Sequence, residues 1–251
     1  MTIAKDQFNT EVFRMGMGNW FLEDGEPLDA GMIGRAEKEA RAQGIVHITV
    51  KIPAPDKNVL NTLLQNGYYL ADTLTEYFFD TKKELPELKH RCILRDASKD
   101  DVPALKAIAR ESFEIDRFHS DRHLSNELCD KYYEKWIENS FHGFAEKVIV
   151  ADYAGCVAGF TTGKTYPDSD IGHLVLSAVS SASRGHGVYT SMIHEGISWI
   201  KRERPGIRGV VVGTQLDNLA VQKAWIRLGF TIHGSMYVLQ KYIGGDHGGQ
   251  V

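Results

Sequence analysis

The chain has 251 residues and a net charge of −4 at pH 7, from 29 Lys and Arg against 33 Asp and Glu. Its 43% hydrophobic and 25% charged residues are ordinary for a globular protein, and its length suffices to bury a core without disulfides or metals. The nearly balanced charge lacks the excess of basic residues that is typical of nucleic-acid-binding proteins. No run approaches the roughly 18 consecutive apolar residues of a membrane span. We therefore expect one large or two small domains, with no nucleic-acid or membrane partner.

The cysteines and the first residues predict the cellular compartment. Cys92, Cys129 and Cys156 are scattered and form no C-x-x-C pair, which argues against a disulfide framework or a zinc site. The opening MTIAKDQFNTEVF lacks the apolar stretch of a signal peptide. These features predict a cytoplasmic protein without a metal.

The N-terminal third resembles a later part of the chain. Residues 56–80 and 217–241 both run from an acidic residue through an amphipathic helix into Gly-aromatic and then an apolar strand, and a buried strand precedes each (45–52 and 207–215). A helix over 28–43 precedes the first copy. We read this as a partial internal duplication, and a polar stretch between Lys82 and His90 predicts a linker. The predicted domains are 1–82 and 90–243, followed by a flexible tail over 244–251.

The second half alternates helices and strands. Ser98 followed by Asp101 predicts a capped helix start, and a polar loop over 116–124 precedes a helix over 125–141. Strands are expected over 147–154, 155–166 and 171–179, and a helix over 187–202. From residue 91 the predicted order is β-α-α-β-β-β-α-β-α-β. Such intermingling favours an α/β fold with a mixed sheet.

A glycine-containing loop joins the strand over 171–179 to the next helix. Glycines at 185 and 187 let the backbone approach a bulky anion, and the helix N-terminus favours negative charge. A pyrophosphate suits this loop, although any strand–helix turn uses such residues. A dinucleotide fingerprint would need a third glycine where Thr190 stands, and the Lys-Ser/Thr of a P-loop is absent.

Two motifs make residues 91–242 resemble the GNAT acyltransferases. Their pyrophosphate loop, Q/R-x-x-G-x-G/A, corresponds to Arg184, Gly185, His186, Gly187, Val188 and Tyr189. Their next helix, N-x6-Y-x3-G-F, corresponds to Asn218, Trp225, Gly229 and Phe230. The chain departs from the pattern at Tyr189, where a small residue is usual, and at Trp225, where tyrosine is usual. The resemblance implies the GNAT acyl-CoA N-acyltransferase fold, a truncated GNAT-like N-terminal half, acetyl-CoA as co-substrate, and a homodimer.

The resemblance also implies roles at the reacting centre. A backbone N–H of Ser177, Ala178 or Val179 is the expected donor to the oxyanion. His173 precedes a run similar to one that follows a glutamate base in histone acetyltransferases of the superfamily. An imidazole suits removal of a proton from an ammonium group, although an ordinary strand histidine is the alternative.

In most GNAT enzymes the tyrosine at the position of Trp225 protonates the departing thiolate, so the resemblance leaves this chain without the expected general acid. An indole N–H does not titrate usefully, so Trp225 is expected to line the pantetheine channel or to hydrogen-bond the sulfur. Tyr237, Tyr189 or a water remain as acids. Asn218 is expected to bind the pantetheine arm, to cap its helix, or to do both.

A narrower resemblance points to the acceptor. Residues 133–140 and 212–218 resemble bacterial dTDP-fucosamine acetyltransferases, which implies a nucleotide-sugar acceptor. The expected acceptor-binding residues are Arg117, Phe118, His119, Tyr133 and Gln215; a solvated loop is the alternative for 116–124. A metal held by His119, Asp121 and His123 is disfavoured, because no fourth ligand is evident. Other small amines, a peptide N-terminus, and an acyl-CoA-binding module without catalysis remain alternative functions.

Overall fold

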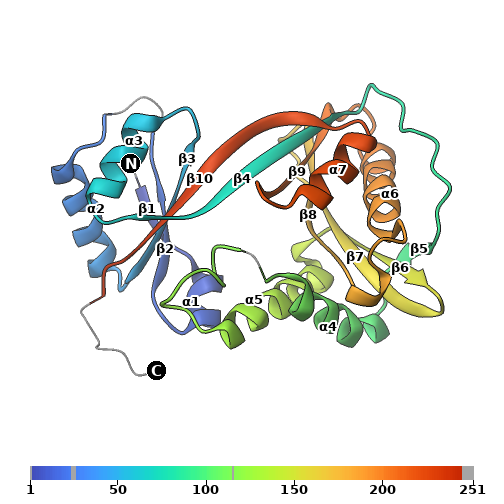
Figure 1. The fold of residues 1–251 in the computed structure, drawn as a ribbon, viewed down its shortest axis with the longest axis horizontal. Helices are drawn as coiled ribbons and strands as arrows, with labels where there is room; N and C mark the ends of the chain where they lie inside the picture. The colour runs from blue at the N-terminus through green and yellow to red at the C-terminus, as the bar shows by residue number, and fades with distance from the viewer. Residues whose placement is uncertain (1, 24–26, 115, 245–251) are drawn as a thin grey trace. The chain divides into compact units, whose positions relative to one another are not determined.

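A computed structural model of the protein describes residues 2–23, 27–114 and 116–244, and it shows the predicted mixed α/β architecture (Figure 1). The N-terminal elements are β1 (Thr2–Lys5), α1 (Gln7–Phe13), β2 (Met17–Phe21), α2 (Ala30–Ala42), β3 (His47–Pro53), α3 (Lys57–Gln65) and β4 (Tyr69–Asp80). There follow β5 (Ile93–Asp96), η1 (Lys99–Asp101), α4 (Val102–Ser112), α5 (Asn126–Asn139), η2 (Ser140–Phe144), β6 (Lys147–Tyr153), β7 (Cys156–Thr165) and β8 (Ile171–Val179). The last elements are η3 (Ser181–Ser183), α6 (Val188–Glu203), β9 (Gly209–Gln215), α7 (Leu219–Arg227) and β10 (Thr231–Tyr242).

The order of elements after residue 91 is the predicted one. The strand–helix–strand formed by β1, α1 and β2 was not predicted. Within the described ranges, no helix combines the length and the hydropathy that crossing a membrane requires. The predicted tail lies, beyond Gly244, outside the described residues.

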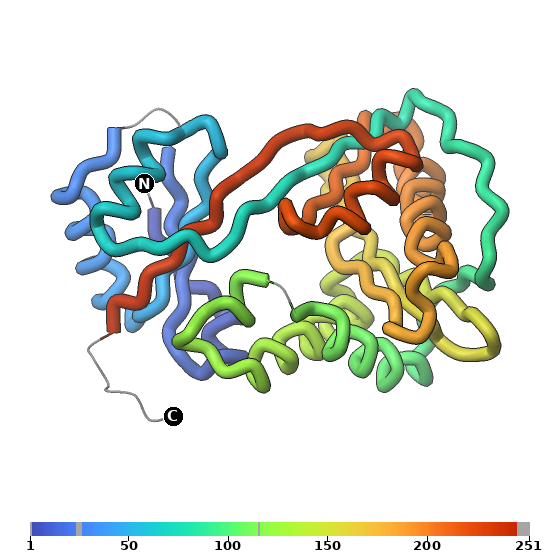
Figure 2. Tube along the Cα trace, viewed as in Figure 1, coloured from blue at the N-terminus to red at the C-terminus, as the bar shows by residue number. Residues whose placement is uncertain are grey.

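The chain divides into two compact units that are interleaved in sequence. Unit 1 contains Met1–Leu74, Ile115–Tyr132 and Ser235–Val251, and unit 2 contains Thr75–Glu114 and Tyr133–Gly234. The long strands β4 and β10 contribute residues to both units and are neighbours in the sheet (Figure 2). The predicted domain boundaries instead follow chain order, and they stay a prediction.

Unit 1 has the strand order β1-β2-β3-β10-β4. The strands β2 and β3 are parallel, whereas β10 runs antiparallel to β3. The core of this unit joins buried residues of the sheet to α2 and α3; they include Ile33, Ile48, Val50, Leu63 and Leu239. The carboxylate of Asp29 accepts from the Met32 N–H at 2.7 Å, so α2 begins with a side-chain cap.

Unit 2 continues the order β10-β4-β9-β8-β7-β6-β5. One face of its sheet packs on α6 and α7 in a core that includes Tyr77, Ile197, Val210, Val212 and Trp225. Two glycines allow the close approach of α6. A Cβ on Gly163 would lie 2.3 Å from the Trp199 ring, and one on Gly196 would lie 2.8 Å from Leu174.

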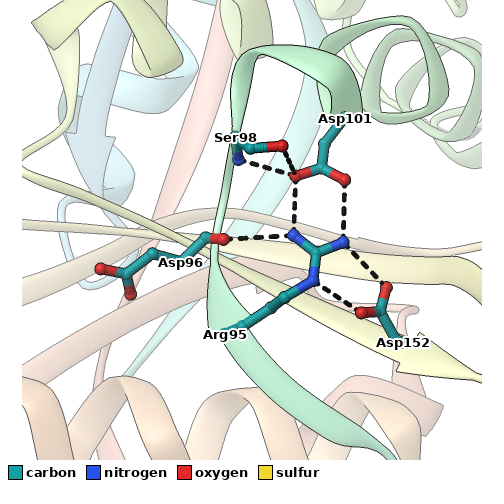
Figure 3. Close-up of polar contacts among 5 residues, drawn as sticks. All are labelled: Arg95, Asp96, Ser98, Asp101 and Asp152. Atoms are coloured by element: carbon teal, nitrogen blue, oxygen red, sulfur yellow. Dashed lines mark hydrogen bonds and ion pairs between the residues drawn. The ribbon is translucent and has the colours of Figure 1, made fainter.

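An arginine between two carboxylates fixes the start of α4 (Figure 3). Arg95 of β5 forms two hydrogen bonds to Asp101, at 2.7 and 2.8 Å, and two to Asp152 of β6, at 2.6 and 3.0 Å. Asp101 also accepts from the backbone N–H of Ser98, as the predicted capping signature requires, and from the Ser98 hydroxyl. The Arg95 guanidinium therefore holds the pKa of Asp101 well below its usual range.

Candidate active site

The loop before α6 has the properties of an anion site. Gly185 and Gly187 both have φ 81°, a conformation that glycine adopts without strain. A Cβ on Gly185 would meet nothing within 4 Å, so the backbone there is open to a bulky group. Gly187 is the N-cap of α6, a helix of 16 residues with no acidic side chain in its first turn. The unpaired N–H groups and positive end of this helix therefore fit a phosphate-bearing ligand.

Two arginines lie at this loop, and the sequence indicated only one of them. Arg184 is exposed within the loop. Arg91 packs beside Gly187, its Cδ 3.8 Å from the position of a glycine Cβ there. The imidazole of His186 stacks on Tyr153 with centroids 5.3 Å apart. The loop thus offers two cations to an anionic ligand, and no motif could have found Arg91, because only the fold places it beside α6.

The strands β8 and β9 pair over only part of their length. Parallel pairing joins residues 171–173 to 209–211 and goes no further in these two fully described strands. On its other side β8 stays paired to β7 as far as Val179, across a register shift near Ser177. The carboxyl-terminal half of β8 therefore has one edge without a strand partner.

The hydrogen-bond alternation of β8 selects the backbone donors on that edge. Ser180 donates to the carbonyl of Ala158 at 2.8 Å, and Ala178 lies opposite Phe160 in the same ladder. Residues of an antiparallel strand alternate the direction of their N–H groups. The N–H of Ala178 consequently points to β7, and those of Ser177 and Val179 point to the unpaired edge. Of the three candidate oxyanion donors, Ser177 and Val179 fit.

His173 lies where the β8–β9 pairing ends. Its neighbour Leu174 packs on α6, so the imidazole points to the opposite face of the sheet. There it meets the Tyr166 ring edge-on, with centroids 5.6 Å apart. Burial lowers the pKa of His173, and the carboxylate of Glu76 partly opposes this. A neutral imidazole at pH 7 can accept a proton.

Glu76 is a site residue that the sequence did not indicate. It alternates on β4 with Tyr77, which belongs to the core against α7, so Glu76 faces the same side as His173. Its Cγ lies 3.9 Å from the position of a Cβ on the exposed Gly213. Glu76, Gly213, His173 and Lys164 thus lie on one face of four adjacent strands, β4, β9, β8 and β7; His173 is directly opposite Lys164 on β7 and opposite Val211, rather than Gly213, on β9. We call these four residues the charged row.

Trp225 and Tyr189 are neighbours within unit 2. Trp225 is 3% exposed, and in the described part of the chain its indole nitrogen makes no regular hydrogen bond. Burial raises the pKa of the Tyr189 phenol, and the nearby Trp225 N–H opposes the rise. The two side chains are therefore close, although their contact falls short of regular hydrogen-bond geometry. The phenol of Tyr189 stays protonated at neutral pH.

Polar side chains gather at the end of β9. Asn218 occupies the N-cap position of α7, yet its amide does not cap the helix. It donates instead to the Thr214 hydroxyl at 3.0 Å, and Thr214 donates to the Gln215 amide oxygen at 3.3 Å. Asn218 is thus the N-cap residue, as expected, but without a capping hydrogen bond from its side chain. Binding of pantetheine by Asn218 and of the acceptor by Gln215 stay predictions.

The loop over 116–124 belongs to unit 1, and the side-chain contacts described below hold it to other residues of that unit. Phe118 is 2% exposed and packs on Phe13 and Tyr132, with centroids 5.0 and 4.6 Å away. This burial contradicts the idea that Phe118 stacks on a base or sugar. Both ring nitrogens of His119 face carboxylates, Asp116 at 2.6 Å and Asp130 at 3.3 Å. No group of His, Cys, Asp or Glu within the described ranges has the arrangement of a metal site.

The remaining candidates are divided between the units. Arg117, in unit 1, stacks its guanidinium over the ring of Phe118, 4.5 Å from the centroid. Tyr133, in unit 2, is 6% exposed and stacks on Phe113 with centroids 4.2 Å apart. Tyr237 lies in unit 1, where its hydroxyl accepts a hydrogen bond from Lys57. Substrate binding by Arg117, His119 and Tyr133, and catalysis by Tyr237, stay predictions.

Comparison with known proteins identifies relatives of the chain. It is 28% identical over 196 residues to the spore coat polysaccharide biosynthesis protein SpsD of Bacillus subtilis (strain 168). That alignment covers 76% of this chain and 64% of SpsD, so the chain spans less than two thirds of this curated relative.

Solved structures share the fold at low sequence identity. A GCN5-related N-acetyltransferase from Sphaerobacter thermophilus has a TM-score of 0.67 and 16% identity, covering 96% of this chain and 76% of its own. A tandem GNAT protein from the clavulanic acid biosynthesis pathway has a TM-score of 0.63 and 15% identity, covering 92% and 76%. The sequence model of the Acetyltransferase (GNAT) family, whose members use acyl-CoA, matches residues 103–230, just over half of the chain. With β8, the loop before α6 and α7 all inside that match, the chain belongs to the GNAT acetyltransferase family.

Proposed function

We propose that the protein transfers an acetyl group from acetyl-CoA to the amine of a nucleotide-linked amino sugar resembling a dTDP-4-amino-4,6-dideoxyhexose. The observation that supports this most is the charged row beside the unpaired edge of β8, because it presents a carboxylate and a base to an amine. The likeness of residues 133–140 and 212–218 to dTDP-fucosamine acetyltransferases supports the acceptor class. The relation to SpsD, named for polysaccharide biosynthesis, is consistent with it.

The loop and the unpaired edge have separate tasks in this proposal. The N–H groups at Gly187 and Val188, with Arg184 and Arg91, bind the pyrophosphate. Bound acetyl-CoA supplies the thioester, whose carbonyl accepts from the N–H of Ser177 or Val179. These donors are fixed in β8 before the reaction begins, so they stabilise the oxyanion without reorganisation.

The charged row prepares the amine. Glu76 attracts the ammonium form of the acceptor, and His173 accepts its proton through a water. The free amine then attacks the carbonyl carbon, the C–N bond forms, and the C–S bond breaks as the oxyanion collapses. Tyr189 donates a proton to the departing thiolate. The amide nitrogen loses its second proton to solvent, which also reprotonates Tyr189, so the protons balance.

Turnover of a panel of amines tests the proposal. The panel contains dTDP- and UDP-linked amino sugars, polyamines and peptides with a free N-terminus, with thiol release as the readout. We expect a nucleotide-linked amino sugar to have the highest kcat/KM, and His173→Ala to change the pH profile of kcat/KM. Preference for a polyamine or peptide would refute the acceptor class. Binding of acetyl-CoA by calorimetry without turnover of any amine would instead indicate a non-catalytic acyl-CoA module.

A further inference from the structure

A lysine at one end of the charged row is held between two exposed aromatic rings. Lys164 of β7 places its ammonium 4.3 Å from the ring centroid of Phe144 and 5.4 Å from that of Tyr166. Phe144 is 55% exposed and Tyr166 is 44% exposed, so both rings present apolar faces to solvent. Isolated exposed aromatics are common, but two that flank one cation form a surface able to bind a planar, anionic ligand. We call Phe144, Lys164 and Tyr166 the aromatic–lysine patch.

Hydrogen bonds made by neighbouring residues fix the backbone around the aromatic–lysine patch, while the Lys164 ammonium stays available to a ligand. Arg204 donates to the carbonyls of Tyr166 and Pro167, both at 3.3 Å, and Glu146 accepts from the N–H and hydroxyl of Thr165. In the described part of the chain, no carboxylate lies within ion-pair distance of Lys164. By contrast, Lys147 of the adjacent strand β6 is paired with Asp96 at 2.7 Å. Among the described residues, Lys164 is thus a positioned cation without a fixed counter-ion.

The patch lies next to the proposed base. Lys164 and His173 are directly opposite each other on β7 and β8, a position that places their Cβ atoms roughly 4.5–5.5 Å apart. Tyr166 contacts both side chains. Along the row, negative charge lies at Glu76 on β4 and positive charge at Lys164 on β7. A ligand with an ammonium group at one end and phosphate at the other matches this polarity.

We propose that the aromatic–lysine patch binds the diphosphate and the base of a nucleoside-diphosphate acceptor, with its amine directed toward Glu76 and His173. Lys164 binds a phosphate oxygen, and Phe144 or Tyr166 stacks on the base. The sugar then spans His173, which brings its amine to the point where β8 and β9 separate. This inference rests on the proposed function for the amine, but the binding of the nucleotide can be tested without turnover.

Calorimetry on protein saturated with CoA tests the patch, because CoA occupies the loop before α6 and keeps the probe from binding there. The probes are dTDP and thymidine, which differ only in the diphosphate. We expect Lys164→Gln to weaken dTDP binding about 10- to 150-fold, as loss of a charge-assisted contact predicts, and to leave thymidine binding unchanged. Lys164→Arg should retain most of the dTDP affinity. Phe144→Leu should weaken both probes.

Lys147→Gln is the matched control, since it removes the same charge from an adjacent strand and should leave dTDP affinity within about twofold of wild type. The inference is overturned if dTDP binds wild type no better than thymidine, or if Lys164→Gln binds dTDP as wild type does. If amino sugars are nevertheless acetylated, the proposed function stands and only the nucleotide site is refuted. If Lys164→Gln abolishes dTDP binding but no amine is acetylated, the nucleotide site survives and the proposed function fails.

Discussion

Replacing Asp121 by asparagine tests whether the loop over 116–124 is anchored as the structure shows. The Asp121 carboxylate accepts from Nε2 of His47 at 2.6 Å, the Tyr69 hydroxyl at 2.6 Å, and both the backbone N–H and Nδ1 of His123 at 2.9 Å. The side chains of Asp121 and His47 are both 0% exposed. Burial disfavours the ionised carboxylate, but these hydrogen bonds outweigh it and hold the pKa of Asp121 well below its usual range.

The contacts set the expected magnitude of the loss. Asparagine keeps the volume but removes the charge and turns one acceptor into a donor, which cannot accept from His47 or Tyr69. A hydrogen bond to a charged group contributes about 1.5–3 kcal/mol, and two buried donors, those of His47 and Tyr69, would lose their carboxylate acceptor, so the expected cost is about 3–6 kcal/mol. We expect Asp121→Asn to destabilise unit 1 by this amount at pH 7. Because the folded-state pKa is depressed, the wild-type advantage is present above the unfolded pKa of about 4 and disappears as the pH falls below it.

Hydrogen exchange read by mass spectrometry measures this effect locally. Peptides covering 47–53 and 116–124 should exchange faster in Asp121→Asn, whereas peptides from α6 should not change. Asp56→Asn is the control in the same unit: Asp56 caps α3 by accepting from the Val59 N–H at 3.3 Å, and asparagine caps equally well. A loss below about 1 kcal/mol for Asp121→Asn, a level typical of an exposed pair, would refute the anchoring role.

Two further predictions concern ligand binding and pH. Gly187→Ala should raise the KM for acetyl-CoA about tenfold, or ~1.4 kcal/mol, whereas Gly155→Ala, which also replaces a glycine at φ 81°, should lower only stability. Equal KM values for the two variants would contradict the binding of acetyl-CoA at the loop before α6. Glu76→Gln should lower the pKa of His173 further, because burial then acts unopposed, and so move the acidic limb of kcat/KM to lower pH. Asp80→Asn, the same change four residues along β4, should leave that limb in place; identical profiles for Glu76→Gln and wild type would exclude the interaction.

Local patterns predicted the fold well, because the causes of its elements are local. The capping contacts between Ser98 and Asp101 involve residues three apart, and apolar periodicity is fixed by the faces of each helix and strand. The loop of Gly185 and Gly187 joins β8 to α6 within a few residues. Sequence alone named three expected oxyanion donors, whereas the ladder to β7 was needed to find which N–H groups face away from β7, those of Ser177 and Val179.

The residues that the sequence missed reach the site through long-range pairing. Glu76 precedes Gly213 by well over a hundred residues and meets it only because β4 lies beside β9. Arg91 reaches α6 in the same way. The loop over 116–124 shows the opposite problem. Its arginines, histidines and phenylalanine are residue types that often bind ligands, so the sequence predicted a substrate-binding loop. Phe118 is instead a core side chain and Asp121 a buried anchor, distinctions that depend on what covers them and leave no local signal.

The two departures from the GNAT motifs meet in space, and this suggests that each explains the other. Tyr189 stands where the family has a small residue, Trp225 stands where it has tyrosine, and Tyr189 packs against the core cluster that contains Trp225. We propose that Tyr189, in the first turn of α6, supplies the hydroxyl that α7 lacks. A general acid contributes about 10²–10⁴-fold, so Tyr189→Phe should lower kcat by at least about 100-fold with little change in acetyl-CoA affinity. The double variant Tyr189→Ala, Trp225→Tyr restores the usual arrangement and should recover much of that loss. Wild-type kcat in Tyr189→Phe, or no recovery in the double variant, would show that the two substitutions are independent and that water protonates the thiolate.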